Sequence, residues 1–210
     1  MTKLASIPRK SGRFHHGNLR PALIQAALQV LQRRGPEAIT LRKIAHLTGV
    51  THTAPYRHFA DKDALLAALA AEGFRSLGDR MQQVKTADPL DRLLEVGVEY
   101  IHFAIENPAQ FRLMYGPELA ARELHPDLKA AAATDFHLLI KIVEACQQNH
   151  LVRDGDRVKL ALTAWSMVHG LALLILDGQL EDAGIGKNSA KQVIEFATAS
   201  LRDGLSRAVR

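Results

Sequence analysis

Hydrogen-bond donors are concentrated between Thr40 and Lys62, and no acidic residue lies between Thr40 and Ala60. Hydroxyl, imidazole, guanidinium and ammonium groups donate to phosphate oxygens and to the acceptor edges of bases. A run of such donors without a carboxylate is typical of a surface that binds a polyanion. We assign ten residues to this surface: Thr40, Arg42, Thr51, His52, Thr53, Ala54, Tyr56, Arg57, His58 and Lys62.

Two short helices joined by a tight turn are expected to position these side chains. Thr40 is suited to cap the first helix, because its hydroxyl accepts from a free backbone N–H in the first turn. Gly49 ends that helix without steric cost, and Thr51 is expected to cap the second. Such a pair is the helix-turn-helix unit, whose second helix enters the major groove of DNA. The alternative is an ordinary helical hairpin in a core, which the run of polar donors disfavours.

A three-helix core is expected to hold this unit together. Apolar residues at helical spacing predict a preceding helix over about 18–34, with Pro21 in its first turn, where a missing N–H is no loss. Gly35 and Pro36 then stop it. The expected core residues of the unit are Ile39, Leu41, Ile44, Ala45, Leu47, Val50 and Phe59.

Pro55 lies inside the predicted second helix. If Thr51 is the N-cap, Pro55 falls at the end of the first turn and loses at most one backbone hydrogen bond. The positions expected to meet base edges are Thr51, His52, Thr53 and Ala54. None of them provides the arginine–guanine or asparagine–adenine pairing that would indicate an operator sequence.

Charge is distributed unevenly along the chain. Residues 1–60 contain ten Lys or Arg residues against one acid, Glu37, which gives +9. The whole chain has 27 basic and 22 acidic residues, a net +5, so residues 61–210 carry −4. This asymmetry indicates that only the N-terminal part meets a polyanion. The basic residues of 1–15 are expected either to form a disordered tail or to contact DNA as an arm.

Helical periodicity continues through the rest of the chain. It predicts helices over about 65–84, 88–106, 111–115, 118–123, 126–149, 158–176 and from about 189 to 207. No segment alternates apolar and polar residues as a strand does, and no repeat is present, so the predicted fold class is all-α.

The last two long helices predict a homodimer. Residues 158–176 are apolar on nearly every side, and a helix of this kind must be covered on all sides. The final helix adds a stripe of Val193, Ala197, Leu201 and Leu205. We expect a four-helix interface from these two helices of each subunit, which would suit a palindromic operator.

A ligand pocket is expected between the C-terminal helices. Trp165 and His169 are four residues apart, so they share one helical face. The alternative for each aromatic residue is ordinary core packing. The residues expected to line the pocket are Phe103, Phe111, Met114, Tyr115, Phe136, Trp165 and His169.

The N-terminal third resembles the DNA-binding domain of TetR-family transcriptional regulators. The resemblance rests on Thr40, Ile44-Ala45, Gly49-Val50, Tyr56-x-His58-Phe59, Lys62 and Leu65-Leu66. Residues 15–20 and 54–59, and Trp165, His169 and Gly170 in AWSMVHG, are similar to the subgroup with a WHG-type C-terminal domain. The resemblance implies that Tyr56, His58 and Lys62 hold the DNA backbone, and that an effector moves a connector helix.

These observations divide the chain into a basic flexible arm (1–15), a helix-turn-helix domain (16–62), a connector helix (63–85) and a ligand-binding and dimerisation domain (86–210). The expected function is a transcriptional regulator, a repressor that binds double-stranded DNA as a dimer and is released by a small-molecule effector. The alternative is an activator or architectural factor that does not sense ligands.

Other classes of protein are disfavoured. The chain contains no HExxH, CxxC, glycine-rich phosphate loop or G-x-S-x-G motif, so we expect neither an enzyme nor a metal site, and no cofactor. Cys146 is the only cysteine and excludes an intrachain disulfide. The longest apolar run, residues 171–176, is far shorter than the ~20 residues needed to cross a bilayer. We therefore expect a soluble cytoplasmic protein without a membrane partner.

Overall fold

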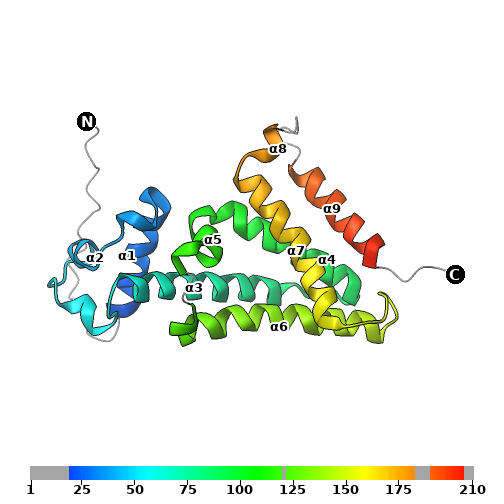
Figure 1. Cartoon of the computed structure of the whole chain (residues 1–210), viewed down its shortest axis with the longest axis horizontal. Coiled ribbons are helices and arrows are strands. Elements are labelled where there is room, and N and C mark those ends of the chain that lie inside the picture. Colours follow the sequence, from blue (N-terminus) through cyan, green and yellow to red (C-terminus); the bar gives the residue numbers. More distant parts are fainter. Residues whose placement is uncertain (1–18, 120–121, 183–189, 206–210) are drawn as a thin grey trace.

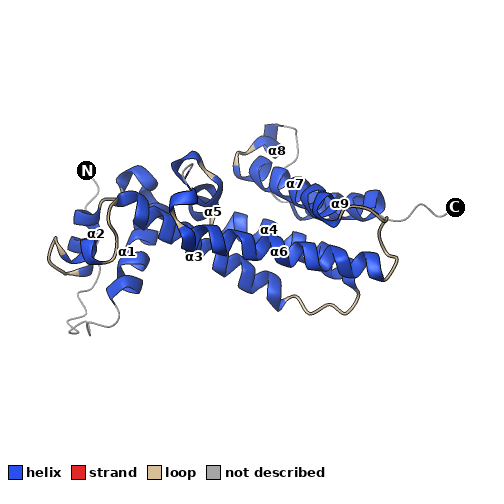
Figure 2. Cartoon of the chain, turned by 60° about the horizontal axis from the view of Figure 1, so that its bottom comes forward, coloured by secondary structure: helices blue, strands red, loops and turns tan. Residues whose placement is uncertain are grey.

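The computed structural model describes residues 19–119, 122–182 and 190–205, and this part of the chain is helical without a strand (Figures 1 and 2). The predicted all-α fold class is confirmed. The expected arm, residues 1–15, and the expected loop at 184–188 lie outside the described residues. The elements are α1 (Leu19–Arg34), η1 (Pro36–Ala38), α2 (Leu41–Thr48), η2 (Ala54–Arg57), α3 (Lys62–Gln83), α4 (Pro89–Glu106), α5 (Pro108–Tyr115), η3 (Pro117–Leu119), η4 (Arg122–Leu124), α6 (Pro126–Gln148), α7 (Arg157–Leu176), α8 (Gln179–Asp182) and α9 (Ala190–Leu205).

A small head is formed by α1, α2, η2 and the start of α3, at the left-hand end of the molecule in Figure 1. Its core contains Leu23, Ile44 and Phe59, each at most 3% exposed. The guanidinium of Arg20 lies 5.4 Å from the centre of the Phe59 ring and covers it. The sequence predicts Leu47 in this core, but its side chain is 44% exposed, because it lies on the outer face of α2.

Helix α3 connects the head to the body. Its N-cap is Asp61, whose Oδ1 accepts from the Ala64 amide at 2.8 Å. The helix has 22 residues, which at about 1.5 Å per residue is about 33 Å of uninterrupted rod. It runs beside α6 through the body of the molecule in both overall views (Figures 1 and 2).

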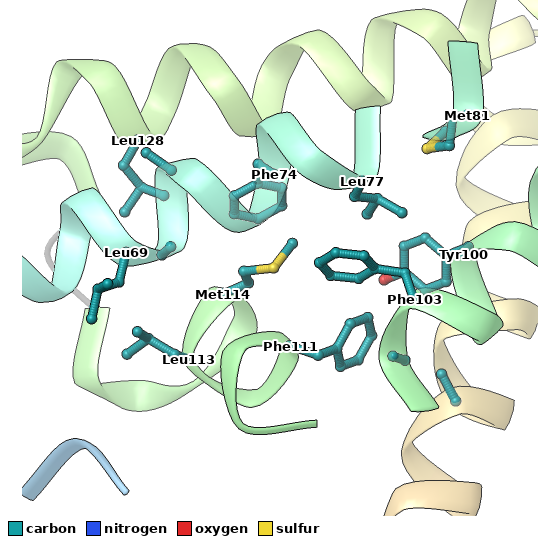
Figure 3. Packing of buried hydrophobic residues seen from close by; sticks show 14 of the residues in the cluster. Leu69, Phe74, Leu77, Met81, Tyr100, Phe103, Phe111, Leu113, Met114 and Leu128 are labelled. Carbon is teal, nitrogen blue, oxygen red and sulfur yellow. The ribbon is translucent and has the colours of Figure 1, made fainter. Parts of the chain in front are cut away.

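The body contains α4 to α7 and α9, packed around the far part of α3. Phe103, Phe111 and Met114 fill the space between α3, α4 and α5 (Figure 3) and are at most 1% exposed. Gln110 is buried with them and donates to the Leu69 carbonyl at 3.0 Å. This bond ties α5 to the α3 backbone, so the contact satisfies a polar group that burial would otherwise penalise.

Helix α7 is long and apolar enough to cross a membrane by length and composition, with a mean hydropathy of 1.6. In the structure it packs against α4, α6 and α9 of the bundle. Its burial is incomplete, since Leu162, Met167 and Leu174 are 38–48% exposed. In α9 the predicted stripe turns inward: Leu201 and Leu205 are buried in their own chain, while Phe196 is 75% exposed. The outward face of α9 thus differs from the one that the sequence indicated.

Candidate nucleic-acid interface and ligand cavity

The turn after α2 has the geometry that its sequence predicts. The Thr40 hydroxyl accepts from the Lys43 amide at 3.1 Å and caps α2. Gly49 has φ 71°, a left-handed conformation that favours glycine. Its amide donates to the His46 carbonyl and that of Val50 to the Ala45 carbonyl, which closes α2 in a Schellman arrangement.

The second element of the unit differs from the prediction. It is a four-residue 3₁₀ helix, Ala54–Arg57, and Thr51 does not cap it. Pro55 has no N–H to donate to the Thr51 carbonyl, so the Ala54 amide bonds that carbonyl instead, at 3.0 Å. The Thr51 hydroxyl faces that of Thr53 at 3.3 Å. Pro55 itself is buried, which fixes this turn on the head.

All ten side chains assigned to the polyanion-binding surface are at least partly exposed. Tyr56 is 57% exposed, and His58 and Arg57 are exposed beside it. Ala54 and Lys62 are the two partly buried members. Lys62 is the first residue of α3, and the N-terminus of a helix attracts anions through its backbone N–H groups. The head therefore presents donors from α2, η2 and the α3 terminus on one small unit.

A cavity of about 300 Å³ lies in the body between α3, α4, α6 and α7. Tyr115, Phe136 and Trp165 line it, as the sequence predicts. The other four expected residues do not: Phe103, Phe111 and Met114 fill the core, and His169 is turned to a hydrogen bond with Tyr100. Helical periodicity predicts burial but cannot separate a core position from a cavity wall, which depends on how the helices meet.

Tyr100 is a cavity residue that the sequence analysis missed. Its hydroxyl accepts from Trp165 Nε1 at 3.0 Å and lies 2.7 Å from His169 Nδ1. Burial lowers the pKa of His169, which keeps the imidazole neutral and leaves Nδ1 free to accept from the tyrosine. Burial also raises the pKa of Tyr100, so its hydroxyl stays protonated. The i, i+4 pair of Trp165 and His169 was a usable signal, because a buried indole N–H needs a partner.

Asp135 is a second cavity residue that the sequence analysis missed. It lies on α6 and is 9% exposed, and its Oδ2 lacks a hydrogen-bond partner in the described structure. Burial, with a smaller contribution from the charge of Asp79, raises its pKa to about 7. Oδ1 packs against the α3 backbone at Gly78, where any side chain would collide with it. The signal in the sequence was an acid in the buried stripe of α6, between Leu128 and Leu139.

A helical body with a cavity, joined by one long helix to a helix-turn-helix head, defines the class of DNA-binding regulators that contain a separate C-terminal domain. Residues 23–69 match the family model described as bacterial regulatory proteins of the tetR family. Residues 93–201 match that of the tetracyclin repressor-like C-terminal domain. The chain therefore belongs to the TetR family of transcriptional regulators. These domains are those of a DNA-binding regulator and not of an enzyme.

Individual relatives agree with this assignment. The HTH-type transcriptional repressor AcnR of Corynebacterium efficiens is 26% identical over 88% of this chain and 93% of its own. An HTH-type transcriptional regulator of Mycobacterium tuberculosis is 29% identical over 53% of this chain, and the match spans 51% of that relative. Among solved structures, a protein of unknown function from Rhodococcus sp. RHA1 superimposes with a TM-score of 0.80, 28% identity and coverage of 93% of this chain and 99% of that one.

Proposed function

We propose that the protein is a repressor that binds a palindromic operator as a homodimer and leaves it when a small molecule enters the cavity. The observation that carries the proposal is the course of α3. Its first residue, Lys62, belongs to the donor surface of the head, and Phe74, Leu77 and Met81 farther along it line the cavity. An occupant of the cavity thus contacts the same rigid element that sets the position of the head.

The donor surface supports contact with DNA through both backbone and bases. Tyr56, His58 and Lys62 are placed to hold phosphates, and the side chains of residues 51–54 lie on the preceding turn toward the bases. The absence of carboxylates from residues 40–60 removes the repulsion that phosphates would otherwise meet. The same proposal includes a basic N-terminal arm that contacts DNA, domain boundaries near residues 62 and 85, and a cytoplasmic location.

The homodimer is supported by the outward face of α7. Thr163, Ser166, Met167, Gly170 and Leu174 follow one another at helical spacing, and the described structure leaves Met167 and Leu174 exposed. A Cβ at Gly170 would have no neighbour within 4 Å. Gly170 and its small neighbours therefore permit another helix to approach closely. Phe196 of α9 is also exposed, and large aromatic side chains of this type often anchor protein–protein interfaces.

Fluorescence anisotropy of the full chain with duplexes from the region upstream of its own gene tests the proposal. We expect saturable binding of two subunits per site, with affinity that falls steeply as potassium chloride is added, because docking releases counterions. Footprints over two symmetric half-sites about one helical turn apart would agree with a dimer. Affinity that does not change with salt would refute the proposed interface.

Footprint position separates the repressor from an activator. Protection over the promoter itself supports repression, whereas protection upstream of the promoter, with transcription raised in vitro, supports the alternative. Affinity for many unrelated sequences at equal strength would instead indicate an architectural factor.

A further inference from the structure

Asp135 is a cavity-lining residue whose carboxyl group has an oxygen without a hydrogen-bond partner in the described structure. The cavity wall is mostly apolar, and a carboxyl group that is 9% exposed with one oxygen unpartnered costs free energy in such surroundings. Of the buried side-chain nitrogen and oxygen atoms in the described residues, only this oxygen and Nε of Arg92 lack a partner. A ligand that donates a hydrogen bond to Asp135 would therefore gain binding free energy.

The other polar groups on the cavity wall are already bonded. The Tyr100 hydroxyl accepts from Trp165 and faces His169 Nδ1 at 2.7 Å. Tyr115 also hydrogen-bonds to Tyr100. A polar ligand group would have to break this network, whereas the carboxyl group of Asp135 lines the same cavity and has no hydrogen bond at Oδ2 to lose. The remaining wall is aromatic where Phe136 and Trp165 lie 6.0 Å apart, centre to centre.

Charges around Asp135 favour a cation over an anion. Asp135 also borders a second hollow of about 380 Å³ between α3 and α6, which Asp79 and Asp127 line as well. The one cationic residue of that hollow among the described residues, Arg75, is paired with Glu72 at 3.2 Å. Three carboxyl groups against one paired guanidinium make the field at this wall negative.

Building on the effector-controlled function proposed above, we propose that the cavity binds a largely apolar molecule with one amine, whose ammonium group bonds the carboxyl group of Asp135. The apolar body lies against Phe136 and Trp165, where the rings also attract a cation. A divalent metal is a poor alternative, since no three histidine, cysteine or acidic side chains converge in the described part of the chain. Carboxylate and phosphate ligands are disfavoured by the unpaired acid.

Protonation of Asp135 gives this site a pH dependence. With its pKa raised to about 7, much of the empty protein holds a neutral carboxylic acid below pH 7. An ammonium ligand binds the ionised form, so its affinity rises with pH and levels off above the pKa. Asp79, Asp127 and Arg75 line the second hollow, which Asp135 also borders, and none of the three lines the apolar cavity. A primary amine stays protonated throughout this range.

Isothermal titration of the full chain with three matched probes tests the proposal: naphthylmethylamine, naphthylmethanol and naphthoic acid. We expect the amine to bind at least about tenfold more tightly than the alcohol at pH 8, as a charge-assisted bond provides, and the acid to bind weakest. Between pH 8 and pH 6 the amine's advantage should shrink. Asp135→Asn should bind amine and alcohol equally, while Asp63→Asn, an exposed residue at the head end of α3 that lines neither hollow, should behave as wild type.

Equal binding of amine and alcohol by the wild type, preference for the acid, or no amine binding at millimolar concentration would overturn the proposal. So would an amine preference that survives in Asp135→Asn, with folding of the variant confirmed by circular dichroism. DNA anisotropy on the same samples separates the two proposals. If the amine binds through Asp135 without changing DNA affinity, effector control fails and the site stands. If the alcohol alone releases DNA in both proteins, the site fails and effector control stands.

Discussion

The indole Nε1 of Trp165 donates to the hydroxyl of Tyr100 at 3.0 Å, and the two residues are 65 positions apart in the chain. This bond joins α7 to α4, and the same hydroxyl also lies 2.7 Å from His169 Nδ1. Trp165 and His169 are two of the three residues that give the WHG subgroup its name. Gly170 is the third, and a Cβ placed there would meet no atom within 4 Å beyond the backbone of its own helix in the described structure. The motif therefore combines an internal hydrogen-bond network with a bare patch on the outer face of α7.

We expect Tyr100→Phe to lower the free energy of unfolding by about 1–3 kcal/mol, because the Trp165 N–H loses its acceptor and His169 its donor. Urea denaturation measures the change. Tyr56→Phe is the matched control: Tyr56 is 57% exposed, so its stability should equal that of the wild type. A Tyr100→Phe protein as stable as the control would show that the network contributes little.

Tyr56→Phe, His58→Ala and Lys62→Ala should each weaken DNA binding by a similar factor on every sequence, because phosphate contacts carry no base information. Lys62→Ala should also reduce the salt slope by about one unit. Gel shifts with operator and scrambled duplexes measure both effects. Lys141→Ala, an exposed residue of α6, should bind as wild type. Altered base preference in any of the three variants would contradict their assignment to the backbone.

The pKa of Asp135 predicts how stability changes with pH. The folded-state pKa of about 7 lies above the ordinary value of 3.8, so the folded protein binds the proton more tightly than the unfolded chain does. The stability that this group contributes is complete below about pH 4. It is lost as the pH rises through 7, by at most about 1.4 kcal/mol per pH unit. We expect Asp135→Asn to melt at a higher temperature than wild type at pH 8. Its advantage should shrink at pH 5 and disappear below about pH 4, and a difference independent of pH would contradict the raised pKa.

Gly170→Arg should convert the proposed dimer to a monomer. A Cβ at this position meets no atom of another element within 4 Å in the described structure, and arginine is a better helix former than glycine, so folding should be preserved or slightly improved. Light scattering after size exclusion gives the mass. Ala133→Arg, an exposed site on α6, should leave the wild-type mass unchanged. A dimeric Gly170→Arg protein would place the interface elsewhere.

Local chemistry explains what the sequence could predict. Thr40, Gly49 and Asp61 act within a few residues of themselves, and each has the cap or turn geometry expected for its type. The 3₁₀ form of η2 depends on one missing N–H at Pro55. Helical periodicity does not reveal how this missing donor changes the role of Thr51.

Tertiary arrangement explains the rest. Whether Phe111 fills the core or Phe136 faces the cavity depends on how helices distant in sequence cross, which periodicity does not encode. The roles of Tyr100 and Asp135 likewise arise from partners on other helices, at Trp165 and Gly78.

The contact between Asp135 and Gly78 has a mechanical consequence. Glycine offers only main chain at this point, so no side chain can bend or change rotamer to absorb a movement of the carboxyl group. A shift of the Asp135 carboxyl group is therefore felt by the backbone of α3, at a point 16 residues beyond the one that begins the helix at the head.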